Sequence, residues 1–72
     1  MKLIERFTGE AARLHAAVEP PFGAGFNEEI AAKTETLEVY GSELKDVGPD
    51  HCEFRALDAR DNIIGSKRVN GY

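Results

Sequence analysis

The chain has 72 residues, 42% of them hydrophobic and 31% charged, and its 13 acidic and 9 basic side chains give a net charge of −4. This length allows one small domain, which buries only about 60% of the surface that the unfolded chain exposes. The single cysteine excludes an internal disulfide, and the net negative charge repels the phosphate backbone of nucleic acids.

The first ten residues, MKLIERFTGE, place Glu5 and Arg6 directly after two apolar residues. This leaves no apolar core of a secretion signal, and no stretch of the sequence is long and apolar enough to span a membrane. We therefore expect a cytoplasmic protein with no membrane partner.

The first eighteen residues show a helical spacing of apolar side chains. The residues that share this spacing are Leu3, Ile4, Phe7, Ala11, Leu14 and Val18. At about 100° per residue they fall within an arc of about 100°, which is typical of one buried stripe. The pattern predicts an amphipathic helix over residues 2–18, ended by Pro20 and Pro21 because proline lacks the amide donor.

Residues 20–26, PPFGAGF, predict a flexible connector that carries two phenylalanines. We expect Phe22 and Phe26 to close the open edge of the core. A ligand site on the surface is the alternative.

Asn27 followed by Glu28 and Glu29 is typical of a helix start. Asparagine caps free backbone amides, and acidic side chains suit the positive end of the helix dipole. We expect a short helical turn near residues 27–33.

Residues 34–40, TETLEVY, fit either a continued helix or a strand. Threonine, valine and tyrosine are common in strands, and Leu37 and Val39 alternate with polar residues, so a strand is favoured. The segment DVGPD, residues 46–50, is typical of the turn that follows.

The last part of the chain predicts a β-hairpin with strands at about 51–58 and 63–69. Its centre, LDARDNII, places polar residues between two apolar stretches, and Asp61 or Asn62 can adopt the left-handed conformation there at modest cost. Gly65 relieves crowding within the second strand or marks a bulge.

The register of this hairpin is open. A three-residue loop sets Leu57 opposite Ile63 and Glu53 opposite Lys67. A four-residue loop sets Glu53 opposite Arg68 instead. In both registers a carboxylate opposes a cation, as favoured cross-strand pairs do.

The segment DHCEF, residues 50–54, sets an aspartate, a histidine and the only cysteine side by side. A nucleophilic cysteine needs a base within hydrogen-bond reach and a lowered pKa. In a strand, however, Cys52 points to one face and His51 to the other. We interpret Cys52 as a small buried side chain, with a thiol-based enzyme centred on it as the alternative.

Ligands for a metal are few, because Cys52, His51 and His15 are the only soft or imidazole candidates. No C-x-x-C or H-x-x-x-H spacing occurs among them. The sequence therefore predicts no metal site and no cofactor.

Four cations lie in the hairpin: Arg55, Arg60, Lys67 and Arg68. They alternate with acidic residues, and no pair of aromatic side chains accompanies them for base stacking. Pairing among these charges explains them better than nucleic-acid binding, so we expect no nucleic-acid partner and keep a weak nucleic-acid-binding module as a further alternative.

The predicted fold is a single α+β domain over residues 1–72. An N-terminal amphipathic helix packs on a small three-stranded antiparallel sheet that ends in the hairpin. Domains this small commonly need a disulfide, a metal or a partner subunit, and only the partner remains. We expect a non-catalytic interaction or accessory module that forms a homodimer or binds another protein.

The dimer prediction follows from apolar side chains on both faces of the predicted sheet, of which one helix covers only one. The residues expected at the interface are Tyr40, Leu57, Ile63, Phe22 and Phe26. The alternative is a monomer in which the loop residues Phe22 and Phe26 fold back over the second face.

Overall fold

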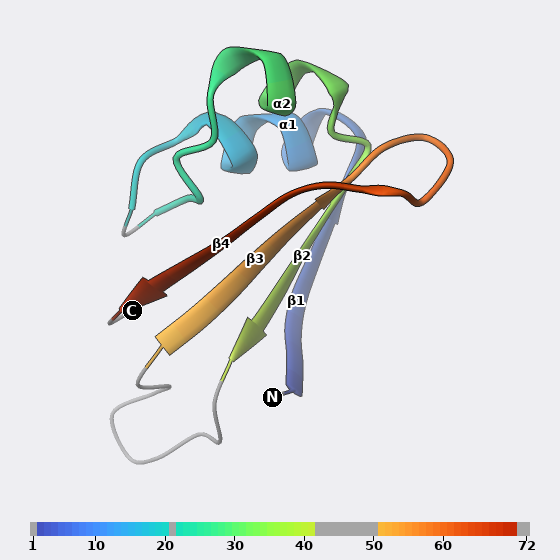
Figure 1. Ribbon diagram of the computed structural model, residues 1–72. Helices are drawn as coiled ribbons and strands as arrows, with labels where there is room; N and C mark the ends of the chain where they lie inside the picture. Colours follow the sequence, from blue (N-terminus) through green and yellow to red (C-terminus); the bar gives the residue numbers. More distant parts are fainter. Residues whose placement is uncertain (1, 21, 42–50, 71–72) are drawn as a thin grey trace.

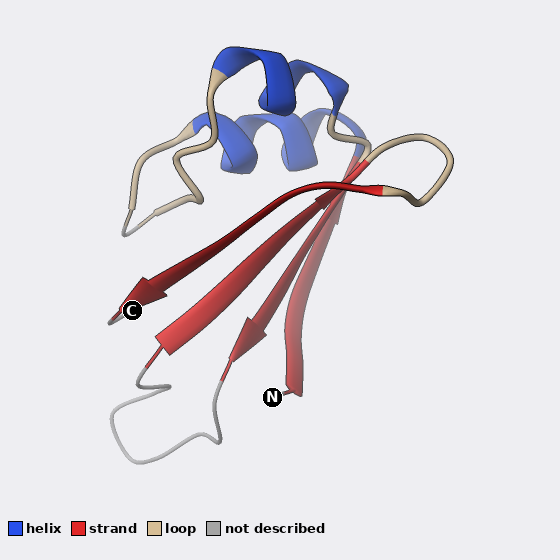
Figure 2. Ribbon diagram, in the orientation of Figure 1, coloured by secondary structure: helices blue, strands red, loops and turns tan. Residues whose placement is uncertain are grey.

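A computed structural model describes residues 2–20, 22–41 and 51–70 of the chain. Its elements in chain order are β1 (Lys2–Thr8), α1 (Gly9–Ala17), α2 (Glu28–Lys33), β2 (Thr36–Gly41), β3 (His51–Leu57) and β4 (Ile63–Asn70). The strands form one antiparallel sheet in the order β1-β2-β3-β4, and both helices lie on one of its faces (Figures 1 and 2). The predicted α+β class is therefore confirmed, but the sheet has four strands instead of three.

The fourth strand is β1, and it corrects the predicted helix over residues 2–18. Gly9 has a φ of +62°, a left-handed conformation that glycine adopts without strain and that separates β1 from α1. A β-bulge lies between Leu3 and Glu5 in the pairing of β1 with β2. This bulge disrupts the alternation expected of a strand, so the apolar spacing resembles a helical stripe.

The second half of the predicted helix exists as α1, but it does not bury the predicted stripe. Ala12 and Ala16 are fully buried, whereas Leu14 is 60% exposed and Val18 is 37% exposed. The helix therefore packs on the sheet through its smallest side chains. Small residues at such a contact allow the helix to approach the sheet closely.

The loop after α1 folds back on the end of that helix. The amides of Ala24 and Phe26 donate to the carbonyl oxygens of His15 and Ala16, at 3.0 and 2.8 Å. A Cβ atom at Gly23 would collide with the backbone oxygens of His15 and Val18. The connector predicted to be flexible is thus held to α1 by backbone hydrogen bonds, and it requires glycine at position 23.

The predicted short helix after Asn27 is confirmed as α2. The Asn27 side-chain oxygen accepts a hydrogen bond from the Ile30 amide at 2.9 Å, which satisfies one of the free amides of the first turn. At the other end, the Thr34 hydroxyl donates to the Ile30 carbonyl at 2.8 Å. The helix consequently ends where the strand favoured by the sequence begins.

The strand over residues 34–40 and the C-terminal hairpin are also confirmed, as β2 and as β3–β4. Asp61 adopts the left-handed conformation, with a φ of +63°. The turn predicted at residues 46–50 lies outside the described residues.

The hairpin register combines features of both predicted alternatives. Leu57 pairs with Ile63, a β-bulge follows, and Glu53 then pairs with Arg68. The bulge leaves Ile64 without a partner in this register and shifts every later pair by one residue. Gly65 follows directly, and a Cβ atom there would lie 3.1 Å from side-chain atoms of both Phe26 and Ile30.

The core lies between the helices and the covered face of the sheet. Its buried apolar residues are Ala12, Ala16, Ala24, Ala31, Leu37, Val39, Cys52, Phe54 and Ala56. Phe7, Phe26, Ile30, Ile64 and Val69 pack around them and are partly buried. Five of the nine buried residues are alanines, so this core is thin.

Candidate interaction surface

The sheet face opposite the helices carries no helix among the described residues, and we call it the open face (Figure 2). Side chains of cross-strand partners point to the same face of a sheet. The register therefore arranges side chains of the open face in three rows, each of which runs across all four strands. The first row is Leu3, Tyr40, Glu53 and Arg68. The middle row is Arg6, Glu38, Arg55 and Ser66. The third row is Thr8, Thr36, Leu57 and Ile63.

A polar network occupies the centre of the open face. The Arg55 Nε donates to the Glu53 carboxylate at 2.5 Å, and the Arg55 guanidinium carbon lies 4.3 Å from the centre of the Tyr40 ring. The Tyr40 hydroxyl donates to Glu38 at 3.2 Å. The hydrogen bond to Glu53 raises the pKa of Arg55 above its already high ordinary value. These contacts join Arg55, Glu53, Tyr40 and Glu38 in one network.

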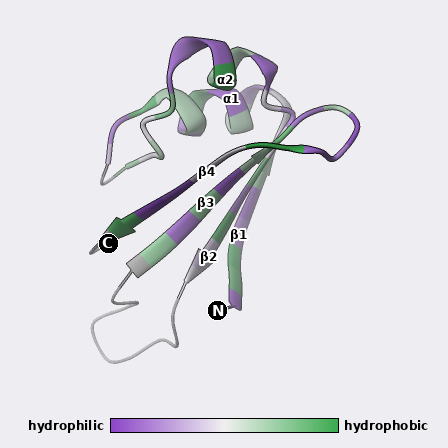
Figure 3. Cartoon of the chain, in the orientation of Figure 1, coloured by the Kyte–Doolittle hydropathy of each residue, from purple (hydrophilic) through white to green (hydrophobic). Residues whose placement is uncertain are grey.

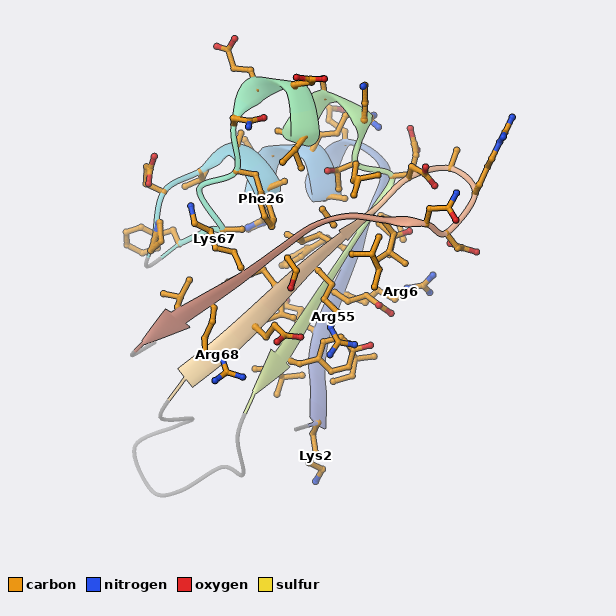
Figure 4. All side chains as sticks on the ribbon, viewed as in Figure 1. Lys2, Arg6, Phe26, Arg55, Lys67 and Arg68 are labelled. Atoms are coloured by element: carbon orange, nitrogen blue, oxygen red, sulfur yellow. The ribbon has the colours of Figure 1, made fainter. Side chains whose placement is uncertain are left out.

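Glu53 also faces a second cation across the hairpin. Its other carboxylate oxygen lies 4.0 Å from Nη2 of Arg68. Only 17% of the Glu53 side chain is exposed, whereas Arg68 is 60% exposed. Figure 4 shows Arg55 and Arg68 on the side of the sheet away from the helices.

Three of the five predicted interface residues lie on the open face. Leu57 and Ile63 are direct cross-strand partners, half-buried and 60% exposed respectively. Tyr40 lies two rows away, half-buried beside Arg55. The open face thus has an apolar end and a charged centre, and polar and apolar residues alternate along β3 (Figure 3).

The other two predicted interface residues belong to the helix side. Phe26 packs against the core next to Gly65. Phe22 is 79% exposed in the loop after α1. Neither therefore folds back over the open face, as the prediction for a monomer had allowed.

A second group of exposed apolar side chains lies on the outer flank of α1 and in the loop after it, and we call it the α1 flank. It consists of Leu14, Val18 and Phe22. The sequence prediction missed it because it assigned Leu14 and Val18 to the core. The spacing of Ala12 and Ala16, one helical turn apart, was the signal for the face that is buried instead.

Cys52 lies in the core, as predicted. Its side chain is completely buried, and this burial raises the pKa of the thiol, which suppresses the nucleophilic thiolate. His15 stacks on the Phe7 ring at 3.9 Å, and within the described residues no hydrogen bond links Cys52 to a base. Cys52 is therefore packed as part of the core.

No metal site is apparent in the part of the chain that the structure describes. There, no three His, Cys, Asp or Glu side chains come close enough together to hold an ion. None of the described helices is long and apolar enough to cross a membrane.

The four hairpin cations do not form one patch. Arg55 and Arg68 lie on the open face with Glu53, whereas Lys67 points toward the helix side (Figure 4). There the Lys67 ammonium donates to the Gly25 carbonyl at 2.9 Å. Arg60 lies in the turn between the strands. This separation gives no continuous track for a phosphate backbone.

A shallow, open cavity of about 390 Å³ lies beside the hairpin turn, lined by Lys33, Glu35, Asp58, Ala59, Arg60, Asn62 and Ile64. Asp58 accepts hydrogen bonds from the amides of Arg60 and Asn62, at 2.9 and 3.0 Å, and these bonds lower its pKa. Glu35 pairs with Arg13 at 3.2 Å. These carboxylates are therefore already engaged in structural contacts.

Comparisons of the chain with models of protein families, with curated proteins and with solved structures found no match.

Proposed function

We propose that this chain is a non-catalytic interaction module that self-associates as a homodimer. The observation that carries the proposal is the placement of its large apolar side chains. Those that remain exposed among the described residues are Leu3, Ile4, Leu14, Val18, Phe22 and Ile63. Their exposure ranges from 37% to 79%, while alanines supply more than half of the buried apolar residues.

This placement has an energetic consequence. Burial of apolar surface stabilises a protein by about 25 cal/mol per Å², and a small domain has little of it to bury. Covering Leu3 and Ile63, the exposed apolar groups in the rows of the open face, with a second copy adds apolar burial that the thin core does not provide. The non-catalytic part of the proposal is supported by Cys52, whose burial raises the pKa of its thiol, and by the structural use of the carboxylates around the hairpin turn.

Sedimentation equilibrium from about 10 to 500 μM tests the proposal, because modest interfaces often have affinities near micromolar. We expect the average mass to rise from one chain toward two across this range. A constant mass of one chain contradicts self-association.

Two matched variants show whether the open face or the α1 flank is the surface that self-associates. Ile63 on the open face and Leu14 on the α1 flank are both 60% exposed, so a lysine at either position disturbs the monomer little. We expect Ile63→Lys to dissociate the dimer and Leu14→Lys to leave it intact. The opposite result assigns self-association to the α1 flank.

A further inference from the structure

We infer that two copies of this chain meet through their open faces, about a two-fold axis that runs parallel to the strands and lies between β2 and β3. This inference rests on the proposed self-association and gives it a geometry. It is carried by the order of charges across the middle row of the open face.

The middle row has an arrangement of charges that can complement itself. Across the sheet it runs positive, negative, positive and neutral, through Arg6, Glu38, Arg55 and Ser66. The two central charges are opposite and come from the two central strands, β2 and β3. A two-fold axis that exchanges these strands therefore brings unlike charges together.

The axis parallel to the strands makes this exchange. It places β2 of one copy over β3 of the other, so Glu38 faces Arg55 of the partner subunit, and the contact occurs twice. Facing sheets lie about 10 Å apart, a gap that glutamate and arginine side chains can span from opposite sides. The same axis places Thr36 over Leu57 of the partner subunit and Thr8 over Ile63 of the partner subunit.

The other two-fold arrangement of facing sheets has its axis across the strands. Each strand then lies over its own copy, and the middle row sets Glu38 against Glu38 of the partner subunit and Arg55 against Arg55 of the partner subunit. Like charges facing each other across an interface cost several kcal/mol. Electrostatics therefore selects the axis parallel to the strands.

The α1 flank lacks this complementarity. The flank is made of apolar side chains, Leu14, Val18 and Phe22, so it has no pair of opposite charges that would set a two-fold geometry.

A charge exchange between copies tests the geometry. Glu38→Arg alone or Arg55→Glu alone sets like charges at both central contacts, and we expect each variant to associate at least about tenfold more weakly than the native chain. In an equimolar mixture both contacts become attractive again, so heterodimers should form with an affinity within about threefold of the native one. Circular dichroism confirms that each variant is folded. Native-like association of either variant alone, or a mixture no tighter than its components, overturns the geometry.

A second pair of variants avoids the central network, in case the first pair does not fold. Ser66 is exposed on the edge strand β4 and faces Arg6 of the partner subunit in the inferred dimer. We expect Ser66→Glu to tighten association about threefold and Ser66→Arg to weaken it by a similar factor. Ala32→Glu and Ala32→Arg, at an exposed position of α2, are controls for net charge.

Tightening by Ser66→Glu cannot arise from net charge, because the chain is already acidic. The inferred axis is overturned if both Ser66 variants change the dissociation constant of the dimer in the same direction. It is also overturned if their changes equal those of the Ala32 controls. A native chain that stays monomeric from about 10 to 500 μM overturns the proposed self-association itself, whereas a native dimer insensitive to positions 38, 55 and 66 overturns only its geometry.

Discussion

The two faces of the sheet differ in chemistry although they come from the same four strands. The covered face presents apolar side chains to two short helices, and its largest fully buried residues are Leu37 and Val39. The open face presents a charged network around Tyr40, with apolar residues at its ends. This contrast shows that the covered face supplies the core, whereas the open face holds a network of charged side chains.

The largest expected effect is on the covered face. Leu37→Ala leaves a cavity in the thin core and should cost about 3 kcal/mol of unfolding free energy. Ile63→Ala on the open face should change it by less than about 0.5 kcal/mol. Urea unfolding at a concentration where the chain is monomeric measures both. Equal losses would show that the two faces contribute alike.

Cys52 gives a smaller effect on the same covered face. We expect Cys52→Ala to cost about 1 kcal/mol through lost packing and to leave self-association unchanged. The native thiol should react with a colorimetric reagent only after unfolding, because it is buried and its pKa is raised. Fast reaction of the folded chain, or loss of an assayed activity without loss of fold, would support a thiol-based function instead.

The ion pairs of the open face should differ in strength from one another. A double-mutant cycle should give a coupling of a few tenths of a kcal/mol between Glu53 and Arg68, which is a loose and exposed pair. The coupling between Glu53 and Arg55 should be larger, because that hydrogen bond is short and its side chains are less exposed. The reverse order would show that the hairpin pairing, and not the central network, organises the open face.

The smallest predicted effect concerns the hairpin turn and pH. Backbone hydrogen bonds lower the pKa of Asp58 in the folded state, below an unfolded value of about 3.9. The ionised carboxylate therefore stabilises the fold above that value, and the stabilisation is lost as the pH falls through the lowered pKa. Thermal unfolding should show a smaller loss of stability between about pH 6 and pH 3 for Asp58→Asn than for the native chain. Identical pH profiles would contradict this role.

The elements that were predictable carry local signals. Asn27 caps α2 from the residue before it, and the polar turn at residues 58–62 closes the hairpin. These interactions span only a few residues, so residue types and their spacing specify them. The same holds for the strand alternation that placed Cys52 in the core.

The part that was missed depends on contacts between distant residues. β1 is a strand because it pairs with β2, and its bulge between Leu3 and Glu5 conceals the alternation that a strand normally shows. Gly9 marks the boundary through its positive φ, a conformation that the sequence pattern alone does not specify. The open face was predicted in part, since the placement of Leu57 and Ile63 follows from the hairpin, while the packing of Tyr40 under Arg55 depends on a neighbouring strand.

The position of β1 in the sheet also has a consequence for the order of folding. Thr8 pairs with Thr36, across both helices, whereas Leu57 pairs with Ile63 across a short turn. Closing a longer loop costs more chain entropy and slows the formation of its contacts. We expect the β3–β4 hairpin to form early and β1 to join the sheet last, although the ribosome synthesises it first. Until β1 arrives, β2 is an unprotected edge strand in the nascent chain, and its pairing groups are open to other strands.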